Sequence, residues 1–228
     1  MEEESSYILV SIQTAYNEWS ESYDTDRNLT RDLDEKVTRE TLSGRKYRCI
    51  LELGCGTGKN TGFLAELSEK VWAFDFSEGM IDRAKKKVAA TNVTFTAADL
   101  GCTWPFQDQA ADLVVSNLVL EHICELPFIF SEAARSLTAG GQFFISELHP
   151  YRQYQGAVAN FKRQEETTDI PAFVHHVSDF MGAANKNGLA LESFQEWWHA
   201  EDEHKLPRLV SFLFRKTEAS GLAETRFT

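Results

Sequence analysis

The stretch "LELGCGTGKN", residues 51–60, has a glycine at every second position: Gly54, Gly56 and Gly58. An apolar run precedes these glycines, and a polar segment compatible with a helix follows them. Glycine lets the backbone turn sharply and lets a ligand approach the chain closely. The stretch therefore predicts either a tight turn or a loop against which a nucleoside lies.

Short apolar segments and helical patterns alternate on the C-terminal side of this loop. This alternation predicts an α/β fold with a parallel sheet, helices on both faces and right-handed crossovers. Two more strands are expected near the C-terminus, after a helix that ends at Gly188. The expected strands cover residues 49–53, 71–74, 93–97, 112–117, 142–148, 189–198 and 208–214.

The regions around this core differ from it in pattern. Before the core, Ile12, Trp19 and other apolar residues recur at helical spacing, and a second helix is expected with Thr30 as its N-cap. After it, residues 150–172 show no clear period. We expect a single domain over residues 1–228. Its parts are a helical cap (1–45), a cofactor-binding core (48–148), a substrate lid segment (149–178), and a C-terminal helix and hairpin (179–228).

Charge and composition exclude several classes of partner. The chain has 23 Lys and Arg against 35 Asp and Glu, a net charge of −12, which disfavours nucleic acids and anionic membranes. The acidic N-terminus does not resemble a secretory signal, and no apolar run could span a membrane, so we expect a cytoplasmic protein. The four cysteines form no CxxC pair, which indicates reduced thiols and no metal site.

Two acidic residues at later strand ends indicate the type of ligand. Asp75 ends the second strand, 21 residues after Gly54, where a carboxylate can accept both hydroxyls of a ribose. Asp99 follows the third strand and could accept the amino group of an adenine. A dinucleotide fingerprint reads GxGxxG, whereas this loop reads GxGxG, and Glu52 precedes it by two residues. These differences favour a cofactor with a positive end, such as S-adenosylmethionine.

The sequence resembles the class I S-adenosylmethionine-dependent methyltransferases, in particular the broad type 11 group that acts on small molecules. This group includes quinone-biosynthesis and malonyl-carrier-protein methyltransferases. The segments that carry the resemblance occur in family order, cover roughly residues 48–150, and are supported by the cap segment "AYNEWSESYD". They are "LELGCGTGKN", "VWAFDFSEGM", "TAADL", "ADLVVSNLVLEHI" and "LTAGGQFFISELHP".

The resemblance implies a Rossmann-like seven-stranded sheet that is mostly parallel, with an antiparallel C-terminal strand. It also implies roles for particular residues, with Asp75 on the ribose, Phe76 on the adenine, and Asp99 and Leu100 at the adenine edge. Glu52 and the loop would hold the methionine part, and Asn117 and Leu118, at the end of the fourth strand, would line the methionine end. The implied cofactor-binding residues are Tyr16, Tyr23, Glu52, Gly54, Cys55, Gly56, Gly58, Asp75, Phe76, Met80, Asp99, Leu100, Asn117 and Leu118.

Methyl transfer is an in-line displacement at an activated methyl group, so positioning and exclusion of water supply much of the rate. A hydroxyl, phenol or protonated amine acceptor would also need a base, and histidine is the most suitable residue type. His122 follows the fourth strand, where it either packs or acts. His149 and Tyr151 are expected to face the substrate, and either His175 or His176 to point into the pocket. The candidate catalytic residues are His149, Tyr151, His122 and His176.

The sequence thus predicts an enzyme that transfers a methyl group from S-adenosylmethionine to an oxygen, nitrogen or carboxylate of a small molecule, releasing S-adenosylhomocysteine. A carrier-bound acyl group or a protein remains an alternative acceptor, and a nicotinamide-dependent oxidoreductase is a weaker alternative. The Pro-Pro-aromatic motif of base-amino methyltransferases is not present after the fourth strand, where the chain reads "SNLVLEH". Either a monomer or a homodimer is compatible with the sequence.

Overall fold

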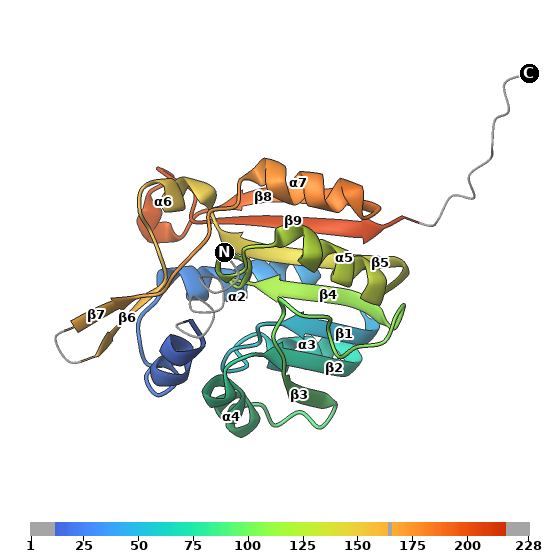
Figure 1. The fold of residues 1–228 in the computed structure, drawn as a ribbon, viewed down its shortest axis with the longest axis horizontal. Helices are drawn as coiled ribbons and strands as arrows, with labels where there is room; N and C mark the ends of the chain where they lie inside the picture. The colour runs from blue at the N-terminus through green and yellow to red at the C-terminus, as the bar shows by residue number, and fades with distance from the viewer. Residues whose placement is uncertain (1–11, 164–165, 218–228) are drawn as a thin grey trace, which may run out of the picture.

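The computed structural model describes residues 12–163 and 166–217, coloured along the chain in Figure 1. The expected cap, lid segment and C-terminal unit are therefore described only in part, because residues 1–11, 164–165 and 218–228 lie outside these ranges. Within them, the chain builds a seven-stranded sheet, a second sheet of two short strands, and helices around the larger sheet.

The large sheet confirms the expected fold class. Its strand order is β3-β2-β1-β4-β5-β9-β8, and every pairing from β3 to β5 is parallel. Strand β9 is antiparallel to both of its neighbours, β5 and β8, and it forms a hairpin with β8. The strands are β1 (Tyr47–Leu53), β2 (Ser68–Asp75), β3 (Val93–Ala97), β4 (Ala111–Asn117), β5 (Leu137–Leu148), β8 (Leu189–Trp197) and β9 (Leu209–Lys216).

The strand order reverses between β1 and β4, and this reversal positions the site. Strands β1, β2 and β4 end at the same level, because Leu53 pairs with Phe74 on one side and with Ser116 on the other. In an open parallel sheet, ligands bind at the carboxyl ends of the strands near such a reversal. The segments that follow Leu53, Asp75 and Asn117 therefore converge at one edge of the sheet.

Helices cover both faces of the sheet (Figure 1). Helices α2 (Leu29–Leu42) and α3 (Thr61–Leu67) bury Val37 and Leu64 against one face, in a cluster with Ile50. Helices α5 (Leu126–Ser136) and α7 (Val177–Lys186) bury Phe130 and Phe180 against the other. Helix α4 (Glu78–Lys87) lies by β3 and is capped by Ser77, whose hydroxyl accepts from Met80 N at 3.2 Å.

Two local predictions were wrong. Helix α2 is capped by Asn28, whose Oδ1 accepts from the backbone N–H groups of Thr30 and Arg31, each at 3.0 Å; Thr30 lies inside the helix. Asn28 takes this role because it has the extended backbone of an N-cap, with φ −142°. The strand expected over residues 142–148 begins earlier, at Leu137, and the pairing of β5 with β4 shifts register between Leu137 and Gln142.

Residues 150–172 contain regular structure that the sequence pattern did not indicate. A short helix, α6 (Pro150–Tyr154), follows β5, and strands β6 (Asn160–Arg163) and β7 (Glu166–Asp169) form an antiparallel hairpin. The hairpin packs on the cap, whose first described helix covers residues 12–19. There Phe161 stacks on Trp19, with 5.5 Å between ring centroids. The cap and the lid segment therefore share one small apolar core.

Candidate active site

A cavity of about 220 Å³ opens at the carboxyl ends of the first four strands, under the cap. Its wall includes residues from the ends of β1, β2, β3 and β4, together with Phe173 from the lid segment. Most of the cofactor-binding residues predicted from the sequence line this cavity, and so does one candidate catalytic residue. They are Tyr16, Tyr23, Gly54, Gly56, Asp75, Phe76, Met80, Asp99, Leu100, Asn117, Leu118 and His122.

The glycine loop needs glycine for two different reasons. Gly54 and Gly56 have φ of +64° and +53°, the left-handed region that residues with a side chain rarely adopt. At Gly54 a Cβ would also lie 2.0 Å from Cγ2 of Val119, so the loop and the turn after β4 are in direct contact. At Gly56 nothing lies within 4 Å of that position, which is open space beside the cavity.

Asp75 orders the loop and keeps acceptor capacity for a ligand. Its Oδ2 accepts from Gly56 N and its Oδ1 from Ser77 N, both at 2.8 Å. A carboxylate has about four lone-pair positions, so each oxygen can accept one more hydrogen. Burial raises the pKa of Asp75 from 3.8 to about 6, although the backbone donors partly offset this effect. The group can therefore accept two ribose hydroxyls when it is ionised.

Asp99 and Leu100 form the cavity wall after β3. Asp99 is exposed, and its Oδ1 accepts from Gly101 N at 2.8 Å, which turns the chain around the carboxylate. Leu100 is buried beside it. The structure thus brings the predicted ribose acceptor and the predicted adenine acceptor to neighbouring strand ends of one cavity.

Glu52, Cys55 and Gly58 do not line the cavity, although the resemblance implied that they touch the cofactor. The Glu52 carboxylate is buried beneath the loop, where it accepts from the hydroxyl of Thr61 at 2.7 Å. Burial raises the pKa of Glu52 from 4.5 to about 8. Cys55 is buried and donates its N–H to Phe74 O, while a Cβ on Gly58 would meet Val88 of the α4 C-cap at 2.7 Å.

The turn after β4 depends on a carboxylate that sequence reasoning missed. Glu147, at the end of β5, accepts from Val119 N at 3.0 Å and from Leu120 N at 2.9 Å through one oxygen. It is buried, and burial raises its pKa well above the usual range. The turn places Leu118 at φ +56° and leads into the 3-10 helix η1 (Leu120–His122). Glu147 lies in the quoted segment "QFFISEL", but nothing in that segment marks it as a partner of the turn.

His122 is the candidate catalytic residue that the structure brings to the cavity. Its Nδ1 lies 2.9 Å from the carbonyl oxygen of Pro171, which can only accept, so Nδ1 carries the hydrogen. Its Nε2 therefore accepts from the hydroxyl of Tyr16, at 2.7 Å. Burial is the main cause that raises the pKa of Tyr16 well above its usual value. The pair joins the cap to the turn after β4.

The structure places the other candidate catalytic residues away from the cavity wall. His149 is buried, accepts from Tyr151 N through Nδ1 as the N-cap of α6, and pairs with Glu196 at 2.9 Å through Nε2. Tyr151 is 54% exposed. His176 is the N-cap of α7 and contacts the hydroxyl of Tyr154 at 2.6 Å. His175 donates to carbonyl oxygens of η1 and the residue after it.

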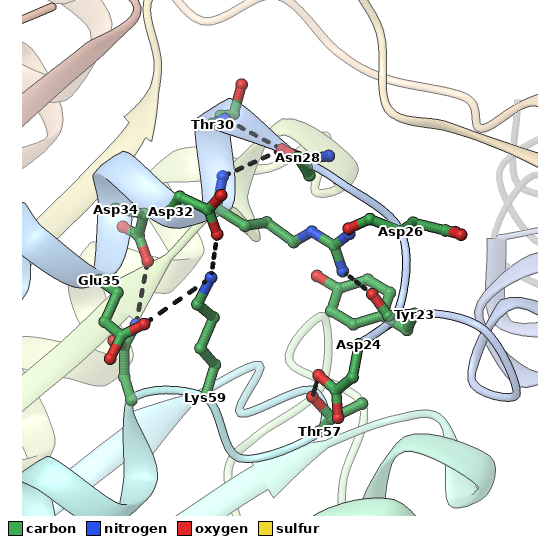
Figure 2. Close-up of polar contacts among 12 residues, drawn as sticks. Tyr23, Asp24, Asp26, Asn28, Thr30, Asp32, Asp34, Glu35, Thr57 and Lys59 are labelled. Atoms are coloured by element: carbon green, nitrogen blue, oxygen red, sulfur yellow. Dashed lines mark hydrogen bonds and ion pairs between the residues drawn. The ribbon is translucent and has the colours of Figure 1, made fainter. Parts of the chain in front are cut away.

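Acidic residues of the cap hold the second half of the glycine loop (Figure 2). Asp24 accepts from the Thr57 hydroxyl at 2.7 Å, and Lys59 donates to Asp32 at 2.8 Å. Lys59 also pairs with Glu35 at 3.8 Å. These contacts tie the cap to the glycine loop.

Within residues 12–163 and 166–217, no helix has the length and apolar character that a membrane span requires. No group of three or more His, Cys, Asp or Glu side chains there is arranged to hold a metal ion.

Comparisons with known proteins agree with the fold and the cavity. Residues 51–145 match the family described as "Methyltransferase domain". An uncharacterized methyltransferase of Emericella nidulans is 27% identical over 218 residues, which cover 78% of this chain and 75% of that protein. A malonyl-[acyl-carrier protein] O-methyltransferase of Serratia marcescens is 30% identical over 138 residues; these cover 60% of this chain but only 52% of that enzyme.

A solved structure is similar over almost the whole fold. The complex of DhpI with S-adenosylhomocysteine superposes with a TM-score of 0.73 and 20% identity, covering 92% of this chain and 97% of that one. At this identity the likeness shows the fold alone.

These findings support an enzyme with methyltransferase activity, in which residues 51–145 are similar to the methyltransferase domain. The cavity is compatible with S-adenosylmethionine as the cofactor, because Asp75 and Asp99, which follow consecutive strands, both keep acceptor positions free for a ligand. The recognition made from the sequence is thereby confirmed, as are the class of enzyme and the cofactor.

Proposed function

We propose that this protein transfers the methyl group of S-adenosylmethionine to an oxygen or nitrogen of a small molecule, and that this acceptor atom carries a proton. The observation that supports the proposal most directly is the pair formed by Tyr16 and His122 in the cavity wall. A proton acceptor at this place suits a hydroxyl, a phenol or an amine, because each must lose a proton as it gains a methyl group.

The cofactor-binding residues retain the roles expected from the sequence, as part of this proposal. Asp75 accepts the ribose hydroxyls, and Asp99 and Leu100 contact the adenine. Phe76, Met80 and Tyr23 form apolar and aromatic parts of the cavity wall around the adenosine. Bound in this way, S-adenosylmethionine supplies a methyl group that is already activated by its positive sulfur.

The protein's own groups then orient the acceptor and take its proton. The acceptor's lone pair forms the new bond to the methyl carbon while the carbon–sulfur bond breaks, and the sulfur keeps that electron pair. The oxygen of Tyr16 takes the acceptor's proton as its own hydrogen passes to Nε2 of His122, along the 2.7 Å contact. The Pro171 carbonyl stabilises the resulting imidazolium, because it accepts the hydrogen on Nδ1.

A carrier-bound acyl carboxylate is a second candidate acceptor, supported by the similarity to the Serratia enzyme whose name states that substrate class. A carboxylate carries no proton at neutral pH and would need no base. Carboxylate side chains line this cavity at Asp75, Asp99 and Glu125 and would repel an anionic acceptor. These charges favour a neutral or cationic small molecule.

Calorimetric titration tests the cofactor, and an acceptor screen tests the reaction. We expect S-adenosylhomocysteine to bind in the micromolar range and NADH not to bind. The screen then measures release of S-adenosylhomocysteine with phenols, alcohols, amines, carboxylates and a malonyl-carrier protein. Turnover with a proton-bearing acceptor supports the proposal. Turnover with the malonyl-carrier protein alone would favour the second candidate, and binding of NADH alone would contradict both.

A further inference from the structure

Asp34 is a buried acidic residue of α2 that does not line the cavity. Its side chain joins the cap to two other elements. Oδ2 accepts from Nδ2 of Asn60, just before α3, at 2.9 Å, and Oδ1 accepts from Nδ2 of Asn117, at the end of β4, at 2.7 Å. Figure 2 shows Asp34 pointing from its helix toward the loop. Burial raises its pKa, and these two donors partly offset that effect.

Asp34 determines which way the amide of Asn117 points. An asparagine amide has nearly the same shape when its oxygen and nitrogen are exchanged, so its hydrogen-bond partners decide the orientation. The Asn117 nitrogen donates to Asp34 and also to the hydroxyl of Thr38, at 2.8 Å. An ionised carboxylate can only accept. The amide oxygen of Asn117 must therefore point away from Asp34.

That amide oxygen is a buried acceptor without a hydrogen-bond partner among the described residues. Asn117 itself lies in the wall of the cavity. Leaving a buried acceptor unpaired costs about 1–3 kcal/mol, so an acceptor held in this position is suited to a donor that arrives with a ligand.

The strand order indicates which part of the ligand reaches Asn117. An adenosine whose ribose lies on Asp75 and whose adenine lies by Asp99 extends from the end of β2 toward β3. Its 5′ substituent must then extend the other way, past the glycine loop after β1, to the end of β4. In S-adenosylmethionine this substituent is the methionine part, which carries an ammonium group with three hydrogen-bond donors.

We propose that Asp34 is a positioning residue, which holds the amide of Asn117 so that its Oδ1 accepts a hydrogen from the ammonium group of bound S-adenosylmethionine. This inference rests on the proposed function. Asp34 acts on the cofactor only through Asn117, and its contribution is specific to ligands that carry the amino acid part.

The variant Asp34→Asn tests this inference because it keeps the size of the side chain. Its amide has only one accepting atom, so it can no longer accept from both asparagines, and the orientation of the Asn117 amide is no longer imposed by a carboxylate. We expect S-adenosylhomocysteine to bind about ten- to a hundredfold more weakly, the range for one hydrogen bond to a charged group. We expect 5′-methylthioadenosine, which has no amino acid part, to bind within twofold of its wild-type affinity.

The comparison of the two ligands separates positioning from a general effect on the cap or the loop. If both ligands weaken equally, or if neither does, the inference is wrong. The charge-matched control is Glu40→Gln near the C-terminal end of α2, whose side chain is exposed and pairs with Lys36, and which should leave both affinities within twofold. The measurement begins with wild type: if wild type does not bind S-adenosylhomocysteine, the proposed function fails before the variants are compared.

Two further variants keep the test decisive if Asp34→Asn does not fold. Thr38→Val removes the second acceptor of the Asn117 amide with little change in volume. We expect this variant to bind S-adenosylhomocysteine about threefold more weakly, or weaker still, and to bind 5′-methylthioadenosine as wild type does. In an Asn117→Ala background, removal of the Thr38 hydroxyl should have no further effect on S-adenosylhomocysteine. Equal losses for both ligands with Thr38→Val, or additive losses in the double variant, would overturn the inference.

Discussion

The hydroxyl of Tyr16 lies 2.7 Å from Nε2 of His122, so the N-terminal cap and the turn after β4 share one hydrogen bond in the wall of the cavity. The ring nitrogen on the other side of His122 is fixed by the carbonyl of Pro171. The histidine is thus held in one tautomer, and its free lone pair is directed at the tyrosine. This relationship makes the proton path of the proposed reaction directly testable.

Replacing Tyr16 with Phe removes the hydroxyl and keeps the ring. With an acceptor that carries a proton, we expect kcat to fall about a hundredfold, in the range for loss of general base catalysis. The KM for S-adenosylmethionine should change less than threefold. Steady-state kinetics with the best acceptor of the screen measures both values.

The double variant with His122→Ala provides the control for this prediction. If the two residues act as one path, the double variant is about as slow as the slower single variant. If the fold-reductions in kcat of the two single variants multiply in the double variant, the two side chains act separately. An unchanged kcat in Tyr16→Phe would remove the hydroxyl from the reaction.

Binding of S-adenosylhomocysteine should depend on pH through Asp75. Burial raises the pKa of this carboxyl to about 6, and only the ionised form can accept both ribose hydroxyls. The affinity should therefore be constant above about pH 7 and fall by up to tenfold per pH unit below about pH 6. Calorimetry between pH 5 and pH 8 measures this profile. Asp75→Asn should bind more weakly at pH 8 and show a flatter profile; a profile as steep as that of wild type would exclude Asp75 as its cause.

We expect the stability of the protein to depend on pH through Glu52. Ionisation of this buried acid should lower stability as pH rises, whereas ionisation of a salt-bridged acid raises it. Burial raises its pKa from 4.5 to about 8, so between these values the native state holds a proton that the unfolded state has lost. The free energy of unfolding then falls as pH rises through this range. Glu52→Gln removes this cost and can still accept from Thr61, so we expect it to be more stable than wild type above pH 8, by on the order of 3 kcal/mol. At pH 4 the two proteins should be alike.

Urea unfolding at pH 4, 6 and 8.5 measures this difference. The control is Glu66→Gln, an exposed glutamate of α3, for which no difference that depends on pH is expected. The slope should be reduced and not abolished in Glu52→Gln, because burial also raises the pKa values of Asp34, Glu121 and Glu147. A constant difference at all three pH values would mean that the pKa of Glu52 is not raised in the native protein.

Local pattern and motif order were sufficient to predict the sheet and the cavity. Apolar strand segments, glycine at the loop and an acid at each of two later strand ends are all readable along the chain. The antiparallel direction of the C-terminal strand, β9, was predicted only from the resemblance to the methyltransferase family. These features are local or follow a fixed order, so residues such as Asp75 could be placed at the site from the sequence.

The features that were missed depend on partners far along the chain. His149 looked like a substrate residue because it ends a strand, but Glu196, 47 residues later, binds its free nitrogen. Helix α2 begins with acidic residues, as many helices do. Nothing in this pattern therefore indicated that Asp34 contacts Asn117, 83 residues away. The β6–β7 hairpin was missed because its strands have only four residues each and are largely polar.

The contact between Gly54 and Val119 predicts a substitution that a second substitution should rescue. In Gly54→Ala the new Cβ would lie 2.0 Å from Cγ2 of Val119, and a valine held by the bond from its N–H to Glu147 has little freedom to move. We expect a loss of about 3 kcal/mol or more in the free energy of unfolding, from overpacking together with the left-handed backbone. Adding Val119→Ala removes the clashing atoms and should restore about half of this loss.

Gly56→Ala separates the two causes of that loss. Gly56 has nearly the same φ, +53°, but a Cβ there meets nothing within 4 Å, so only the backbone cost of about 1–2 kcal/mol applies. Val119→Ala should not rescue this variant. Urea unfolding of the single and double variants gives all the values. If Gly54→Ala and Gly56→Ala lose equal stability, or if Val119→Ala rescues neither, the loop and the turn after β4 are not in the close contact that forms this wall of the cavity.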